Sequence, residues 1–356
     1  MTAVIFVPTI ASFLDDLKAR HDLLEPARKQ GLQTGLMLVI RPQDLTTEKI
    51  GLQLGNLARF VNLDTADRPA VIAMHPNMPI DGNERLNFLT NVTHSLECVK
   101  KGIEFVARIP RELAPAEGKV LSFHLNTLVK PNKWVPNQDH WSKRFEKVVQ
   151  QIAVLANFGK SKGVDIAVET TPIPEFGDLR RDEKHLLEDG TYWSDLGNPW
   201  PLLFWRDEIS KLRKAGCKLA IDLCHSYIAY KAVLEVKRLV ESGKSQAFST
   251  YMVHPSDIEA AQSADFAKMV LQNTMPGDIW HVNDARGMYQ TALLQGKDRT
   301  FEEGVVPFEG DIPGKPLKEL IAKGRELPIK LVIEVNETDF QNSPNTKATL
   351  AIVLNG

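Results

Sequence analysis

Short runs of aliphatic and β-branched residues recur along the chain at regular intervals. Short runs dominated by apolar residues are typical of strands buried on both faces of a parallel sheet. Eight such runs are present: Ala3–Val7, Leu36–Ile40, Ala70–Met74, Val120–Phe123, Asp165–Val168, Lys218–Ile221, Asp278–Trp280 and Lys330–Ile333. The pattern therefore predicts eight buried strands.

Segments with helical spacing of apolar residues separate these runs. We expect helices within Ala11–Gln30, Thr47–Phe60, Leu86–Val106, Trp141–Lys160, Pro201–Ala215 and Pro316–Lys323. Glycines stand where helices should end, at Gly31, Gly102, Gly163 and Gly216. Eight strands that alternate with helices predict an α/β protein of the (β/α)8 TIM-barrel type. A doubly wound open sheet is the alternative, but the first strand and its helix lack the G-x-G-x-x-G of its dinucleotide-binding form.

The length of 356 residues suits either two domains or one large α/β barrel. Since no internal repeat or low-complexity linker divides the chain, we expect a single domain over residues 1–356. Two segments exceed the loops of a minimal barrel: a Trp-rich insertion at about 173–206 and a long loop at about 287–313. Both would lie at the C-terminal face, where barrel active sites are built. The insertion is expected to be a cap with its own small core, a lid or a dimer contact.

Charge and cysteine content narrow the class of protein. Lys plus Arg number 43 against 45 for Asp plus Glu, a balance that makes nucleic acid a less favoured partner. No run approaches the ~20 apolar residues of a membrane span, and the first residues lack the features of a signal peptide. Three cysteines in a chain of this length are not a disulfide framework. We therefore expect a cytoplasmic protein with reduced thiols and no membrane partner.

Acidic and imidazole side chains end every run from the third to the eighth. They are His75, His124, Glu169, Asp222 with His225 three residues later, His281 and Glu334. In a parallel barrel the strand ends converge, so these side chains would share one cavity. Several carboxylates cannot stay ionised in one cavity unless cations offset their repulsion and desolvation. Because imidazoles and carboxylates together bind Zn²⁺, Mn²⁺ or Fe²⁺, the pattern predicts a metal centre. Asp284, close to His281, is expected to orient a metal ligand rather than to be one.

The order and spacing of these residues resemble the xylose isomerase-like TIM-barrel superfamily, which includes sugar and sugar-phosphate isomerases and epimerases and the endonuclease IV repair enzymes. The resemblance is strongest at Ile221–His225 and His281–Asp284. For the isomerase and epimerase branch it implies one metal held by Glu169, Asp222, His281 and Glu334. The two glutamates would also act as the acid/base pair at the carbon beside a metal-polarised carbonyl. His225 and Arg286 would contact the sugar oxygens.

The endonuclease IV branch implies three zinc ions with further ligands at His75, His124 and His225. Its D-T-C-H segment resembles Asp222-Leu223-Cys224-His225 here, whereas its D-R-H signature corresponds to Asp298-Arg299-Thr300. Asp298 would then remain as a ligand while a histidine is lost. The aromatic residue that wedges into DNA corresponds to Met78. This resemblance therefore implies ligands for up to two metals without the nucleic-acid apparatus.

Together these observations predict a metal-dependent enzyme with one or two divalent ions, drawn from Mn, Zn, Fe, Co or Mg. We expect a sugar or sugar-phosphate isomerase or epimerase that acts on a small carbohydrate. The alternative is an endonuclease IV-like, multinuclear phosphodiester hydrolase. The sequence leaves a homo-oligomer open.

Overall fold

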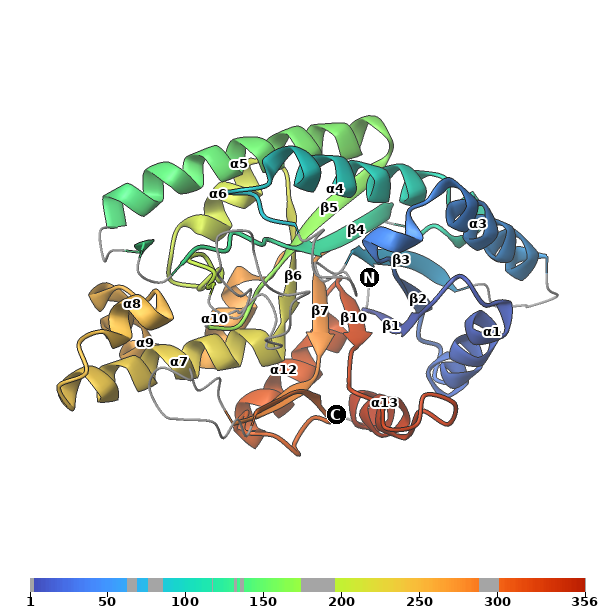
Figure 1. Cartoon of the computed structure of the whole chain (residues 1–356). Helices are drawn as coiled ribbons and strands as arrows, with labels where there is room; N and C mark the ends of the chain where they lie inside the picture. The colour runs from blue at the N-terminus through green and yellow to red at the C-terminus, as the bar shows by residue number, and fades with distance from the viewer. Residues whose placement is uncertain are drawn as a thin grey trace.

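The predicted barrel is confirmed in the computed structural model, which describes residues 3–62, 69–75, 86–116, 118–130, 133–134, 138–173, 196–287 and 301–355. Eight parallel strands close into a barrel in the order β1-β10-β7-β6-β5-β4-β3-β2 (Figure 1). Their bounds are β1 Val4–Thr9, β2 Thr34–Val39, β3 Ala70–His75, β4 Lys119–His124, β5 Val164–Glu169, β6 Lys218–Asp222, β7 Ile279–Val282 and β10 Lys330–Ile333. Each of these strands overlaps one of the eight apolar runs.

The helices surround the barrel (Figure 1). They are α1 Leu14–Leu23, α2 Glu25–Lys29, α3 Thr47–Val61, α4 Val92–Ala107, α5 Gln138–Ser161, α6 Glu208–Lys214, α7 Leu223–Glu241, α8 Ala247–Tyr251, α9 Pro255–Ser263, α10 Phe266–Asn273, α12 Gly314–Glu326 and α13 Pro344–Asn355, with 3₁₀ turns at Pro42–Asp44 and Arg111–Leu113. The helix expected over Ala11–Gln30 is split in two, because Pro26 lacks the N–H and clashes with the preceding turn. Gly31, Gly163 and Gly216 follow helices with positive φ, as expected. The expectation for Gly102 is wrong, since α4 continues through it as a buried position.

One cluster of buried apolar side chains, to which every strand contributes, fills the barrel interior. It consists of Val4, Phe6, Met37, Ile72, Val120, Ala167, Ala220, Ile279 and Val332. Gly35 on β2 is required beside it, because a Cβ there would overlap the ring of Phe6. The opposite faces of the strands pack against the helices in a larger apolar core. The polar strand ends therefore stand above a packed floor, at the C-terminal mouth of the barrel.

The two long segments expected at this mouth differ from plain loops where the structure describes them. After β7 the chain forms an antiparallel ribbon of β8 (Asp284–Gly287) and β9 (Phe301–Val305). In the Trp-rich insertion, residues 174–195 lie outside the described part of the chain. Trp200 beyond them packs on Trp141 and Phe145 of α5, with ring centroids 5.7 and 5.1 Å away.

No helix in the described part of the chain combines the length and the apolar character that crossing a bilayer requires.

Candidate active site

Four neighbouring strands bring the predicted ligands to one level of the barrel mouth. His124 ends β4, Glu169 ends β5 and Asp222 ends β6, while His281 is the third residue of β7. The strand register pairs His124 with Glu169 and Asp222 with His281. Glu334 directly follows β10, whose Val332 pairs with His281. Parallel pairing therefore achieves the convergence that the sequence pattern suggested.

A buried triad of Glu169, Asp222 and His281 forms the centre of this mouth, with potential ligand atoms within 4.8 Å of one another. His281 Nδ1 lies 3.4 Å from Glu169 Oε1, 3.4 Å from Asp222 Oδ2 and 2.7 Å from Glu334 Oε2. Within the described part of the chain, both ring nitrogens of His281, Glu169 Oε2 and Glu334 Oε2 are buried without an aligned hydrogen-bond partner. Atoms held this close without aligned hydrogen bonds are arranged as ligands around a shared cation would be.

A second triad shares Glu169 with the first. His124 Nε2 lies 3.1 Å and His225 Nδ1 3.5 Å from Glu169 Oε1, and the potential ligand atoms again lie within 4.8 Å of one another. His124 and His225 are more accessible than the buried triad, with 18% and 13% of their side chains exposed. Glu169 is therefore placed where it could bridge two cations.

Hydrogen bonds from two residues that the sequence did not single out hold this arrangement in place. Asn283, just after β7, donates from Nδ2 to Asp222 Oδ2 at 2.9 Å and accepts from the backbone N–H of Cys224 at 3.0 Å. The carbonyl of Thr170, just after β5, lies 3.1 Å from His225 Nδ1. If Nδ1 carries the proton and donates it to this carbonyl, the lone pair of the neutral imidazole lies on Nε2. Nε2 is then the nitrogen that could bind a cation or accept a hydrogen bond. Their positions directly after strand ends were the only sequence signal for either residue.

Known proteins resemble this chain in fold rather than in sequence. No protein-family model matches the chain, and no curated protein matches its sequence. Among solved structures, a xylose isomerase domain protein from Planctomyces limnophilus is similar with a TM-score of 0.51 and 13% identity, over 99% of this chain and 95% of that one. The chain has the fold of the xylose isomerase-like TIM barrels. An L-ribulose 3-epimerase (TM-score 0.52, 11% identity, 99% and 93% covered) and a 3-keto-D-glucoside 4-epimerase from E. coli (0.51, 11%, 99% and 99%) share it.

The charges at the barrel mouth compensate one another. Burial alone would raise the pKa of Glu169, but His124 and His281 outweigh that effect and hold the pKa well below its usual value. Burial would lower the pKa of His281, yet the carboxylates of Glu334 and Glu169 raise it well above its usual value. The buried carboxylate is therefore ionised and requires positive charge, which a divalent cation can supply in place of an imidazolium.

The other residues that the sequence analysis singled out are not seen among the converging ligands. His75 ends β3, but its side chain lies outside the described part of the structure, as do Asp298 and Met78. Arg286 is on β8, half exposed, where it binds Glu302 at 2.7 Å and the carbonyl of Glu309 at 2.9 Å rather than the ligand set. Asp284 does not orient a metal ligand. Its carboxylate accepts backbone N–H groups of Ala285, Phe308, Gly310 and Ile312, and so shapes the turn after the ribbon.

The ribbon also brings in an acid that the sequence analysis missed. Glu303 of β9 places Oε1 3.8 Å from His225 Nε2, with 34% of its side chain exposed. No sequence signal identified it, because its neighbourhood depends on the pairing of β8 with β9.

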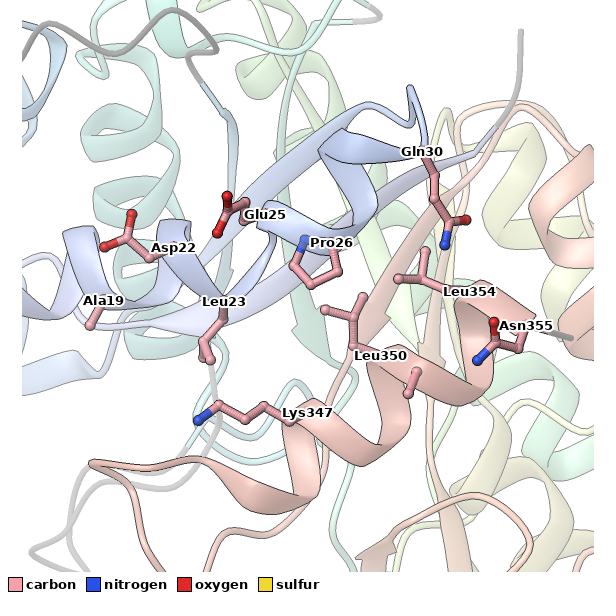
Figure 2. A pocket seen from close by; sticks show the side chains of 11 residues that line it. Ala19, Asp22, Leu23, Glu25, Pro26, Gln30, Lys347, Leu350, Leu354 and Asn355 are labelled. Carbon is pink, nitrogen blue, oxygen red and sulfur yellow. The ribbon is translucent and has the colours of Figure 1, made fainter.

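A separate cavity of about 560 Å³ lies in the outer helical layer, between the α1–α2 segment and α13 (Figure 2). Its lining includes Leu23, Leu350 and Leu354, with Asp22 and Lys347 among the polar members. None of the residues that converge at the barrel mouth contributes to it. The candidate metal ligands are therefore all at the C-terminal mouth, where TIM-barrel active sites usually lie, and not in this cavity.

Proposed function

We propose that this protein is a divalent-metal-dependent isomerase or epimerase of a small carbohydrate. The observation that carries the proposal is the convergence of Glu169, Asp222 and His281, whose potential ligand atoms lie within 4.8 Å of one another, with Glu334 Oε2 2.7 Å from His281 Nδ1. Among the described residues, both ring nitrogens of His281 lack an aligned hydrogen-bond partner. These four residues would hold the cation. Mixed nitrogen and oxygen donors favour Mn²⁺, Fe²⁺, Co²⁺ or Zn²⁺ over Mg²⁺. A bound divalent ion would polarise a substrate carbonyl and make the adjacent carbon more acidic.

The chain's own residues supply the proton transfer. Glu169 and Glu334 lie on either side of His281, whose Nδ1 is 3.4 Å from one carboxylate and 2.7 Å from the other. One carboxylate would take the proton from the carbon beside the carbonyl, and the other, as the acid, would return a proton to that carbon or its neighbour. Return to the opposite face inverts the centre, whereas return to the former carbonyl carbon gives the isomer. Glu334, one-third exposed, is the more accessible of the two.

Two further observations support this function. His124 and His225 lie beside Glu169 with 18% and 13% of their side chains exposed, so their imidazoles would contact sugar hydroxyls bound next to the buried triad. Two of the solved structures that share the fold are sugar epimerases by name. We also propose that residues 1–356 form a single barrel domain.

The test is metal content followed by proton exchange. We would quantify metals in protein purified without chelator, load it with Mn²⁺, and incubate it in D₂O with a panel of ketoses and aldoses. Deuterium incorporation at the carbon beside the carbonyl, detected by NMR and lost after chelation, is the expected result. Metal binding without exchange on any sugar would count against the proposal, and a protein that takes up no metal would overturn it.

A metal-dependent phosphodiester hydrolase remains a second candidate because of one observation. The triad of His124, Glu169 and His225 shares Glu169 with the buried triad, which suits two cations on either side of one carboxylate. Two equivalents of zinc or iron, together with cleavage of abasic DNA, would favour this function instead.

A further inference from the structure

A second cavity lies in the helical layer, where residues of α5, α6 and α9 and the segment before α6 meet. Its volume is about 420 Å³, which suits a small ligand. The aromatic part of its wall consists of Trp141, Phe145, Trp200 and Trp205. None of the residues that converge at the barrel mouth lines it. The cavity is therefore separate from the proposed active site.

The aromatic wall is held in place by contacts within the protein. Trp200 packs on Phe145 and Trp141, with ring centroids 5.1 and 5.7 Å away. The half-buried Trp205 donates from Nε1 to Asp257 Oδ1 at 2.9 Å. Because these rings are already fixed, a ligand that packs on them would not bear the cost of ordering them.

The carboxyl group of Glu208 lines the same cavity, with only 10% of its side chain exposed. Its Oε1 lies 3.8 Å from Arg206 Nη1, which is beyond hydrogen-bond distance. Within the described part of the chain, Glu208 Oε2 is buried and has no hydrogen-bond partner. A buried polar group without a partner is costly and uncommon in a folded protein, so this carboxyl is placed to accept a hydrogen bond from a ligand.

The cationic side chains that line the cavity are committed to other carboxylates. Arg206 donates from Nε to Asp257 Oδ1 at 2.9 Å and from Nη2 to Asp257 Oδ2 at 2.5 Å. Lys211 Nζ lies 2.9 Å from Glu146 Oε1 and 3.0 Å from Asp207 Oδ2. Since one guanidinium faces both Asp257 and Glu208, one carboxylate of this cluster is in excess. Burial raises the pKa of the Glu208 carboxyl, although Arg206 opposes this.

A cationic donor would meet both requirements of the cavity. An ammonium group offers N–H donors to an unpartnered carboxylate and compensates its charge, and charge-assisted hydrogen bonds are the stronger kind. Indole rings also attract cations through their electron-rich faces. A hydroxyl group could donate to the carboxylate but would leave the charge uncompensated.

We propose that this cavity binds a primary amine as its ammonium ion, carried on an apolar or aromatic body. The ammonium would donate to Glu208, and the body would pack on the rings of Trp200 and Trp205. This binding site is additional to the proposed function and does not depend on it.

The test is calorimetry with the full-length, Mn²⁺-loaded protein at neutral pH, with 2-phenylethylammonium chloride as the probe. 2-Phenylethanol is the matched neutral ligand, because it carries a hydroxyl on the same body. Methyl α-D-glucopyranoside tests whether the cavity takes a sugar instead. Each ligand would be titrated into the wild type, Glu208→Gln and Glu146→Gln. Glu146 is the control, since it binds Lys211 but does not line the cavity.

We expect the wild type to bind the ammonium compound about tenfold or more tightly than the alcohol. Glu208→Gln should weaken binding of the ammonium compound about tenfold and leave binding of the alcohol within about twofold. Glu146→Gln should stay within about twofold of the wild type for both ligands. Thermal unfolding would show that the variants are folded, and the comparison of the two ligands in the wild type needs no variant.

Three results would overturn the proposal: no binding of the ammonium compound, equal binding of the ammonium compound and the alcohol, or binding that Glu208→Gln leaves unchanged. The last result would place the ammonium elsewhere on the protein. Binding of the glucoside in place of the ammonium compound would assign the cavity to a hydroxyl ligand and so also refute the proposal. None of these results depends on turnover of a sugar, so failure here leaves the proposed function intact.

Discussion

The carboxylate of Asp222 is shared between the first turn of helix α7 and the imidazole of His281. It ends β6 and acts as the N-cap of α7, where Oδ1 accepts the backbone N–H of His225 at 2.8 Å. The other oxygen, Oδ2, lies 3.4 Å from His281 Nδ1. One side chain thus starts a helix, fixes the spacing to His225 and faces the proposed metal position.

This double role predicts that two substitutions of Asp222 will differ in stability but agree in metal loss. Asn is as good an N-cap as Asp, whereas Ala is not, so Asp222→Ala should be about 1 kcal/mol less stable than Asp222→Asn. Both variants lose the anionic ligand and should bind metal weakly. Urea unfolding of the metal-free proteins and metal analysis by mass spectrometry would check this. Equal stability of the two variants would show that the cap contributes little.

Glu169 is the residue on which both triads depend. Glu169→Gln removes its charge and its basicity, so we expect proton-exchange activity to fall by about 10²–10⁴-fold. Glu208→Gln is the matched control: Glu208 is also buried, but it lies at the start of α6, and burial raises its pKa although Arg206 opposes this. Glu208 belongs to neither triad, so its replacement by an amide should leave proton exchange unchanged. Activity that survives in Glu169→Gln would refute the site assignment.

Substitution of His124 distinguishes a site with one metal ion from a site with two, when the metal content of the variant is compared with that of the wild type. His124 belongs to the accessible triad and is not part of the buried one. We expect His124→Ala to keep one equivalent of metal, held by the buried ligands, whether the wild type binds one or two. Mass spectrometry of the native holoprotein would count the ions. A variant that holds no metal would show that the buried set cannot bind an ion by itself.

His254 should make stability depend on pH. Burial and the nearby Arg206 lower its pKa to about 4, against the opposing effect of Asp257. In the unfolded chain, His254 takes up a proton near pH 6.5, whereas in the folded protein it does so only near pH 4. The contribution of the neutral His254 to the free energy of unfolding is therefore complete above pH 6.5 and is lost as the pH falls toward 4. Between pH 7.5 and 4.5, this titration should lower the free energy of unfolding by about 2 kcal/mol.

The measurement for His254 is urea unfolding at both pH values for the wild type and His254→Gln. The variant also loses the packing of the ring on Trp134, whose centroid lies 5.0 Å away, but this loss applies at both pH values. Only the difference between the two pH values reports the titration. The same pH dependence in both proteins would contradict the prediction.

Much of the fold could be predicted because burial on both faces leaves a strong mark on a strand. All eight runs became barrel strands, and the helix over Thr47–Phe60 was found almost to its ends. Helices α7 to α10 and α13 were not assigned in advance. Residues 223–273 hold four of these helices in succession, so no strand run separates one from the next. In α4, tertiary packing overrode the local preference of Gly102 to end a helix.

For the candidate site, the sequence alone determined the residue types at the strand ends, since the apolar runs stop at them and parallel strands end together. It could not determine which neighbouring side chains face the same space. The hydrogen bonds of Asn283 and Asp284 were decided only in three dimensions, as was the position of Glu303, rather than Arg286, next to His225. The ribbon pairs residues that are 14 to 21 positions apart in the sequence, and a shift of one residue in that register would turn every side chain to the other face.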